Sequence, residues 1–205
     1  YNYLDVAYQA GQKGFRLAAD RGSAIVVMEP LRGGFLINNV PAEMREMLQQ
    51  VRPDWSLADW ALRWIWNQPE VGTVLSGMSA MDQVEENLRI AASPTDFGAR
   101  EEEALATVRK WFDDHLAVNC TGCGYCLPCP KGVAIPDVFT YLNEYHMDDS
   151  PAVHERARMV YGIILPVEKN ASQCVSCHAC ESRCPQNVAI AEKMAEAVTA
   201  LGPTA

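Results

Sequence analysis

The segment CVSCHACESRCP, residues 174–185, has the pattern Cys-x2-Cys-x2-Cys-x3-Cys-Pro. Cysteines packed this closely can attach a haem, bind zinc, form disulfides or hold an iron–sulfur cluster. Each of these groups requires a different backbone around the thiols. The choice between them therefore decides which fold the second half of the chain adopts.

A second group of cysteines precedes this segment, in the pattern Cys-x2-Cys-x2-Cys-x2-Cys-Pro. No cysteine lies outside the two groups, and the second group follows the first at an offset of 54 residues. Complete grouping of this kind favours a metal framework over scattered core cysteines. The members of the two groups are Cys120, Cys123, Cys126, Cys129, Cys174, Cys177, Cys180 and Cys184.

Three of the four readings explain the pattern poorly. Cys174-x-x-Cys177-His178 could attach a c-type haem, but the other two cysteines would be unexplained and the first group has no matching histidine. Disulfides are disfavoured because no secretory leader opens the sequence. Structural zinc sites usually use two cysteine pairs that lie a dozen or more residues apart. A purely structural metal-binding domain stays as an alternative.

The remaining reading is a pair of 4Fe-4S clusters. The spacing of the second group is that of bacterial two-cluster ferredoxins, in which the fourth cysteine ligates the other cluster. Three thiolates on one curled loop cover one face of a cubane, and the proline directs the chain toward the partner cluster. The shorter spacing before Cys129 leaves the reach of that ligand open. The predicted ligand sets are Cys120, Cys123 and Cys126 with Cys184, and Cys174, Cys177 and Cys180 with Cys129.

Residues beside the thiols are expected to act on the clusters through hydrogen bonds. Gly122 and Gly124 should let backbone amides approach the sulfur atoms, and such contacts tune the reduction potential. We expect His178 to be a neighbour of a sulfur atom and not a ligand.

The first half of the chain alternates predicted helices with short apolar strands. We predict strands at residues 24–28 and 73–76 and helices at residues 4–21, 41–51, 56–68 and 82–91. Ser56 and Asp59 form the pattern of a capping box, and Trp60 and Trp64 are expected in the core. This alternation predicts a parallel sheet with helices on both faces. Two strands do not complete such a sheet, so we expect it to continue upstream of Tyr1 or in another chain.

A domain boundary is predicted within residues 93–116. The segment SPTDFGAREEEAL, residues 93–105, contains proline, glycine and three glutamates that we expect at a solvated helix start. Further helices are predicted from Pro136, at residues 153–164 and at residues 190–201. The expected organisation is residues 1–92, a connecting helix at residues 93–116, and a cluster-binding domain at residues 117–205.

Composition excludes two classes of partner. The chain has 205 residues, a net charge of −9 and 49% hydrophobic residues. Without a basic patch, such a surface repels nucleic acid. No apolar run is long enough for membrane insertion. We therefore expect a cytoplasmic protein.

Several stretches resemble the aldo-keto reductase family. AIVVMEPLRGG (24–34) resembles its seventh strand and following loop, ALRWIWNQPEVG (61–72) the helix before its last strand, and TVLSGMSAMDQVEENL (73–88) its eighth strand and cofactor loop. The run CTGCGYCLPCP (120–130) is similar to a branch of predicted aldo-keto reductases with a C-terminal 4Fe-4S dicluster domain. The helices between the cysteine groups resemble helical dicluster domains of respiratory and flavin-linked reductases. The resemblance implies an α/β C-terminal portion of a TIM (β/α)8 barrel, followed by a mainly α-helical two-cluster ferredoxin-like domain.

The resemblance also implies a dinucleotide site, with NAD(P) as the cofactor of a complete barrel. Leu31 would lie beside the pyrophosphate, and Glu86 and Asn87 would reach the adenine. Gln83 stands where many members carry an arginine for the 2′-phosphate of NADP. The alternative, which we weigh equally, is that these residues only close the barrel.

Other positions depart from the family pattern. Gly77 replaces a common phosphate-binding lysine, and Met28 replaces a tyrosine that stacks on nicotinamide. The catalytic Asp, Tyr, Lys and His of the family lie in the first half of its barrel, which this sequence does not contain. His115, His146 and His154 are in the wrong places to substitute for them. We therefore predict no catalytic residue, and we do not expect this chain alone to reduce carbonyls.

The expected function is that of an iron–sulfur oxidoreductase of aldo/keto reductase type that transfers single electrons. Nicotinamide transfers two electrons together as hydride, whereas clusters transfer one at a time, and no flavin motif links the two. The expected electron partner is a redox protein or the upstream half of the barrel. The alternatives are a non-enzymatic ferredoxin-like carrier or docking module, and a structural metal-binding domain.

Overall fold

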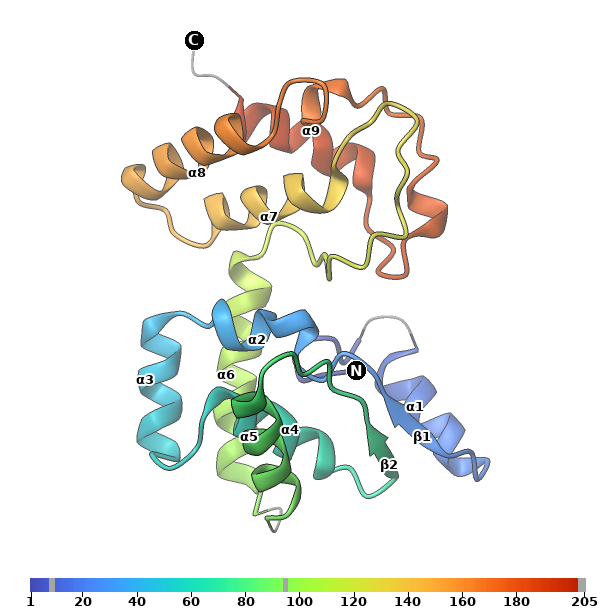
Figure 1. Cartoon of the computed structure of the whole chain (residues 1–205), viewed down its shortest axis with the longest axis vertical. Coiled ribbons are helices and arrows are strands. Elements are labelled where there is room, and N and C mark those ends of the chain that lie inside the picture. Colours follow the sequence, from blue (N-terminus) through green and yellow to red (C-terminus); the bar gives the residue numbers. More distant parts are fainter. Residues whose placement is uncertain (8–9, 94–95, 203–205) are drawn as a thin grey trace. The chain divides into compact units, whose positions relative to one another are not determined.

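The computed structural model describes residues 1–7, 10–93 and 96–202 (Figure 1). The chain divides into two compact units, Tyr1–Phe112 and Asp113–Ala205. The division falls inside the segment 93–116, where the sequence predicts a boundary. Residues 94–95 of that segment lie outside the described residues.

Unit 1 contains a short sheet among helices. Its elements are α1 (Gly11–Asp20), β1 (Ile25–Val27), η1 (Arg32–Gly34), α2 (Phe35–Asn38), α3 (Ala42–Val51), α4 (Leu57–Trp66), β2 (Val71–Val74), α5 (Met81–Ala91) and α6 (Ala99–His115), the last of which crosses into unit 2. The described part of this unit is therefore mostly helical, with few strands.

The two strands pair in parallel, as predicted. Val27 lies opposite Val74, and the amide of Leu75 donates to the carbonyl oxygen of Val27 at 2.9 Å. Beyond this bond the segment that follows β1 leaves the extended conformation, because Glu29 has φ 53°. The predicted strand at residues 73–76 is therefore wrong in its bounds, and β2 lies two residues earlier.

The predicted helical cover on both faces of the sheet is also wrong for the described residues. Val27 is buried on one face, whereas Val26 on the opposite face is 56% exposed. Met28 and Leu75, which follow the strands, are exposed as well.

The first helix begins later than predicted. The side-chain oxygen of Asn2 accepts hydrogen bonds from the amides of Leu4 at 3.0 Å and Asp5 at 3.1 Å, and these bonds form a turn. Gly11 has φ 53°, which interrupts a helix that would start at residue 4. Residues 8–9 of the predicted helix 4–21 lie outside the described residues. Gly22, with φ 71°, ends α1 as predicted.

The helix α4 forms the centre of unit 1. The side chain of Ser56 accepts from the amide of Asp59, and the Asp59 carboxylate accepts from the amide of Ser56, both at 3.1 Å. This confirms the capping box. Trp60 and Trp64 are buried, as predicted for core residues.

The glutamate-rich start of α6 differs from the prediction. Glu101 is buried, and its Oε2 accepts from the amide of Gly98 at 2.9 Å. The guanidinium of Arg52 lies 3.2 Å from Oε1 of the same carboxylate. The expected solvated helix start is therefore wrong for Glu101, because this carboxylate caps the helix and pairs with an arginine.

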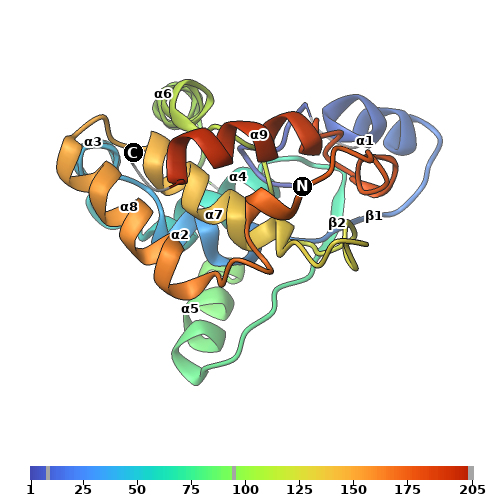
Figure 2. The same cartoon turned by 90° about the horizontal axis from the view of Figure 1, so that it is seen from above.

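Unit 2 is built on three helices, α7 (Ile135–His146), α8 (Pro151–Ile164) and α9 (Ile190–Leu201), with the turns η2 (Ala171–Gln173) and η3 (Glu181–Arg183). The three helices pack against one another (Figures 1 and 2), and Phe139, Leu142 and Met194 lie in their core. All three helices were predicted. No helix among the described residues combines the length and apolarity needed to cross a membrane.

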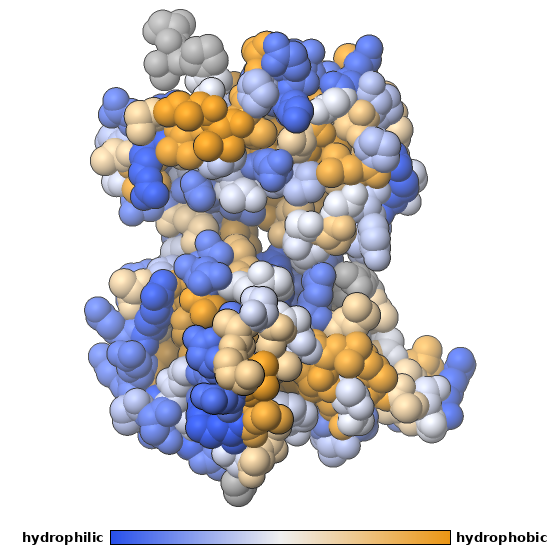
Figure 3. Space-filling view, viewed as in Figure 1, coloured by the Kyte–Doolittle hydropathy of each residue, from blue (hydrophilic) through white to orange (hydrophobic). Residues whose placement is uncertain are grey.

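The outer side of α8 is apolar and exposed. A space-filling view shows a hydrophobic patch over this helix (Figure 3), where exposed apolar side chains gather. These residues are Met159, Ile163, Ile164 and Val167.

Candidate metal centres

The two cysteine loops have matching backbone conformations. In the first loop Gly122 and Gly124 have φ 71° and 75°, and in the second loop Ser176 and His178 have φ 52° and 58°. These pairs occupy the same positions relative to the first cysteine of each group. The internal repeat is therefore a repeat of conformation as well as of sequence, and glycine occupies both left-handed positions only in the first loop.

The chain also leaves the two loops in the same way. The segments CPKGVAI (129–135) and CPQNVAI (184–190) share the pattern Cys-Pro-x-x-Val-Ala-Ile. The residue before the valine is left-handed in both segments, with φ 77° at Gly132 and φ 53° at Asn187. Both segments end on the isoleucine that begins a helix, Ile135 in α7 and Ile190 in α9. Each fourth cysteine is thus followed, through a matching segment, by a helix of the core of unit 2.

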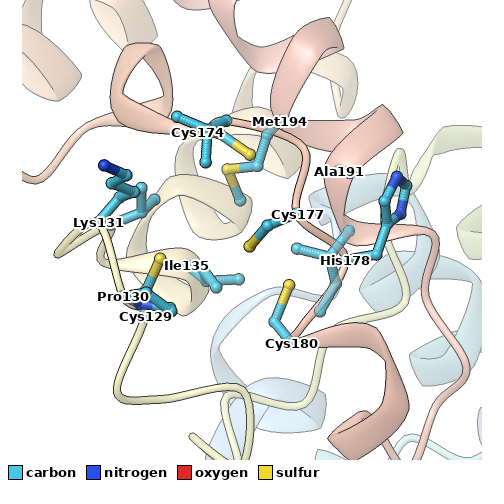
Figure 4. Close-up of a pocket in the computed structure, with 13 residues that line it drawn as sticks. Cys129, Pro130, Lys131, Ile135, Cys174, Cys177, His178, Cys180, Ala191 and Met194 are labelled. Carbon is cyan, nitrogen blue, oxygen red and sulfur yellow. The ribbon is translucent and has the colours of Figure 1, made fainter.

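Two cavities lie between the loops, and each is lined by cysteines from both groups. Cavity A is lined by Cys120, Cys123, Cys126 and Cys184. Cavity B is lined by Cys174, Cys177, Cys180 and Cys129, whose side chains project into the same space (Figure 4). The space outside protein atoms, open solvent included, is about 350 Å³ in cavity A and about 380 Å³ in cavity B. The structure therefore gathers the same two sets of four cysteines that the sequence suggested.

The unequal spacing of the groups does not prevent this arrangement. The extra residue before Cys184 is taken up by the turn η3, whereas the shorter first loop brings Cys129 to cavity B without such a turn. The walls between the thiols are mostly apolar. Ile135 and Ile190 line both cavities and so lie between them.

The thiols surround a space and do not converge on one point. All eight are free of disulfides. Among the described residues, no group of three or more His, Cys, Asp or Glu side chains has the geometry to hold a single metal ion. A tetrahedral zinc ion would need its sulfur atoms about 2.3 Å away. Within the described part of the chain, the thiols are therefore not arranged as a closed four-sulfur zinc site.

Burial governs the ionisation of the thiols in both cavities. Burial, with a smaller contribution from the nearby Cys120 and Cys123 thiols, raises the pKa of Cys126 to about 11. Burial is also the main cause of the raised pKa of Cys180. At neutral pH these thiols stay protonated unless a metal stabilises the thiolates. Iron binding would therefore release protons from these side chains.

Sequence reasoning missed a hydrogen-bonded pair that holds the first loop. The buried side chain of Asn143 on α7 donates to the carbonyl oxygen of Val118 at 2.8 Å and accepts from the amide of Val118 at 2.8 Å. Val118 lies two residues before Cys120. An asparagine on the apolar face of α7, four residues after Phe139, is the signal that could have identified this contact.

The residues beside the thiols lie partly as expected. The amide of Gly122 donates to the sulfur of Cys120 at 3.4 Å. His178 lines cavity B, but its ring lies away from the four sulfur atoms (Figure 4) and its Nδ1 is 2.9 Å from Oε2 of Glu181. The other oxygen of Glu181 accepts from the amide of Ala191 at 2.9 Å, which ties the second loop to α9.

Unit 1 contains a separate groove, in which the space outside protein atoms, open solvent included, is about 1970 Å³. It lies at the ends of β1 and β2 and at the start of α5. All four residues that the family resemblance places at a dinucleotide line it, as do the two departures from the family pattern. These residues are Leu31, Gln83, Glu86, Asn87, Met28 and Gly77.

The polar groups of this groove are largely engaged within the fold. Oε1 of Gln83 accepts from the amides of Ser79 at 2.9 Å and Ala80 at 3.4 Å. Nδ2 of Asn87 donates to the hydroxyl of Ser76 at 3.1 Å. The described lining contains one arginine and two glutamates, so it has no excess of positive charge for phosphates.

Two family models match different parts of the chain. Residues 1–99 match the aldo/keto reductase family and residues 119–189 match a 4Fe-4S dicluster domain. A curated relative, the "Probable glycolate oxidase iron-sulfur subunit" of Bacillus subtilis (strain 168), is 33% identical over 90 residues, which are 42% of this chain and 19% of the relative. Among solved structures, aldo-keto reductase AKR11C1 from Bacillus halodurans (apo form) is similar with a TM-score of 0.41 and 23% identity, over 53% of this chain and 41% of that chain.

The chain thus spans less than half of either protein. The dicluster match indicates iron–sulfur clusters and agrees with the presence of eight cysteines. The chain combines an aldo/keto reductase-type segment with a ferredoxin-type 4Fe-4S segment, in that order.

Proposed function

We propose that this chain binds two 4Fe-4S clusters and transfers single electrons within an iron–sulfur oxidoreductase of aldo/keto reductase type. The observation that carries the proposal is the composition of cavities A and B, each with three cysteines from one group and the fourth from the other. These eight cysteines are the proposed ligands. Cross-ligation of this kind is the arrangement of two-cluster ferredoxins.

The surroundings of the cavities support electron transfer. Apolar walls limit water near the clusters, and burial and hydrogen bonds to sulfur are the means by which a protein sets their potentials. Because Ile135 and Ile190 line both cavities, the two clusters would be neighbours across a thin apolar wall. Electrons could then pass from one cluster to the other inside unit 2.

The proposed partner is a redox protein or another part of the same enzyme, such as the upstream half of a barrel. The curated relative is named as an iron–sulfur subunit of an oxidase, which supports a chain that carries electrons for a separate catalytic unit. We also propose that unit 1 is the C-terminal portion of a barrel. Its two parallel strands support a sheet that continues in further strands, and the uncovered side chain of Val26 supports a further layer on that face of the sheet.

NAD(P) binding in the groove of unit 1 is a second proposal. The clustering of Leu31, Gln83, Glu86 and Asn87 in one groove favours it. Titration of the full chain with NADH and NADPH, followed by nucleotide fluorescence, tests it. Saturable binding that is lost in Asn87→Leu supports the proposal, and no binding at millimolar nucleotide contradicts it.

Anaerobic reconstitution tests the cluster proposal. The full chain should turn brown and contain about eight iron and about eight acid-labile sulfide ions, because each cubane contains four of each. A colourless protein that contains zinc and no sulfide would establish a structural metal site instead.

Two serine variants test the cross-ligation. Cys184→Ser should impair the cluster of cavity A, whose other proposed ligands are Cys120, Cys123 and Cys126. Cys129→Ser should impair the cluster of cavity B. Electron paramagnetic resonance of the reduced variants distinguishes the two clusters. Damage confined to cavity B in Cys184→Ser would rule out the cross-ligation.

A further inference from the structure

A buried side chain at cavity A has no partner among the described residues. Gln186 is buried, and neither its Nε2 nor its Oε1 makes a hydrogen bond there. Buried side-chain amides are nearly always hydrogen-bonded, so this pair of atoms requires an explanation.

The surroundings of Gln186 supply one for its Nε2 donor. The residue follows Cys184 and Pro185 and lines cavity A. Apart from the four cysteines and Thr121, the other residues that line this cavity have no polar side chain. The side-chain amide carries two N–H donors, and sulfur atoms of a bound cluster or its thiolates are acceptors without donors.

We propose that Gln186 is a positioning residue for the cluster of cavity A, donating an N–H hydrogen bond from its side chain to a sulfur atom of that site. The inference rests on the proposed function, since it requires a cluster in cavity A. The hydrogen bond would stabilise the reduced cluster, which carries one more negative charge, more than the oxidised cluster. Gln186 therefore raises the reduction potential of this site.

The internal repeat makes the effect specific to one cluster. The third residue of the segment 129–135 is Lys131, and the third residue of the segment 184–190 is Gln186. Lys131 lines cavity B but is exposed. One site thus has a buried neutral donor where the other has a solvated cation. This difference is one way in which two nearly repeated loops obtain different potentials.

The test is a redox titration of the full, anaerobically reconstituted chain, followed by electron paramagnetic resonance. Gln186→Leu should lower one of the two midpoint potentials by about 59 mV, which corresponds to a roughly tenfold smaller equilibrium constant for one-electron reduction. Lys131→Gln, the matched control, should leave that midpoint unchanged. Unchanged midpoints in a fully loaded Gln186→Leu protein, or a shift of the same midpoint in Lys131→Gln, would overturn the proposal.

Iron counts keep the test decisive where the leucine variant loads poorly. Gln186→Met, which is closer in length and also lacks a donor, is then compared with Gln186→Asn, which keeps the amide. Loss of iron from the leucine and methionine variants with normal loading of the asparagine variant supports the hydrogen bond. Loss from all three shows that the shape of the residue matters and contradicts it. A wild-type chain that binds no cluster would instead contradict the proposed function.

Discussion

The contact between Asn143 and Val118 predicts how firmly the first cysteine loop is held. Asn143→Leu keeps the size of the side chain but removes both 2.8 Å hydrogen bonds to Val118. Val118 is only 3% exposed, so its amide loses its partner without gaining water, whereas its carbonyl oxygen keeps the hydrogen bond from the amide of Cys120 at 2.9 Å. An unsatisfied backbone group costs about 1–3 kcal/mol, so the loss of the one amide partner should destabilise the loop by about 1–3 kcal/mol. The lower value corresponds to roughly fivefold more frequent opening of the loop.

Hydrogen exchange of the reconstituted chain measures this opening. Peptides that contain Val118 should exchange at least about fivefold faster in Asn143→Leu, because about 1 kcal/mol is the lower cost of the unsatisfied amide. Iron transfer to a chelator should accelerate as well, because Cys120 follows closely. Asn143→Asp keeps the acceptor for the amide but places a second acceptor 2.8 Å from the carbonyl oxygen of Val118, so it should not restore wild-type exchange. Thr140→Ala on the exposed side of α7 is the control, expected within about 0.5 kcal/mol of wild type. Unchanged exchange at Val118 in Asn143→Leu would refute this account of the loop.

Three further predictions concern other parts of the chain. Burial acts to raise the pKa of Asp59, but hydrogen bonds from two arginines and Ser56 outweigh it and lower that pKa. Asp59 should therefore stabilise unit 1 fully above about pH 4, the usual range of a free carboxyl, and lose this contribution as the pH falls through its lowered pKa. Asp59→Ala should destabilise unit 1 by about 3–5 kcal/mol in thermal unfolding at pH 7 and remove most of this acid dependence; an acid dependence equal to wild type would contradict the assignment. Gln83→Arg should raise the affinity for NADPH roughly tenfold while leaving that for NADH unchanged, as measured by nucleotide fluorescence, because a charge-assisted hydrogen bond to the 2′-phosphate becomes available; equal changes for both nucleotides would argue against it. Gly122→Ala should speed iron loss to a chelator, because a left-handed residue with a Cβ costs about 1–2 kcal/mol, whereas Ser176→Gly at the matching position should not; equal rates in the two variants would show that the left-handed positions are not strained.

Local patterns in the sequence were sufficient to predict much of the fold. The helices of unit 2, the capping box at Ser56 and the burial of Trp60 and Trp64 were predicted, because apolar periodicity and end signals act within a few residues. The start of α1 and the bounds of β2 were wrong. Both depend on partners that the periodicity of the segment does not show, namely the side chain of Asn2 and the point where β1 ends.

The cysteine spacing determined by itself which residue type would carry the chemistry and how the thiols would be grouped. The same spacing predicted that Cys184 would join the first group and Cys129 the second, but the reach of Cys129 stayed open until the tertiary structure placed it in cavity B. The roles of Asn143 and Gln186 were likewise decided by packing. An amide side chain looks the same in sequence whether it faces water, a backbone carbonyl or a cavity lined by sulfur, because its hydrogen-bond partner is chosen by elements that lie far away along the chain.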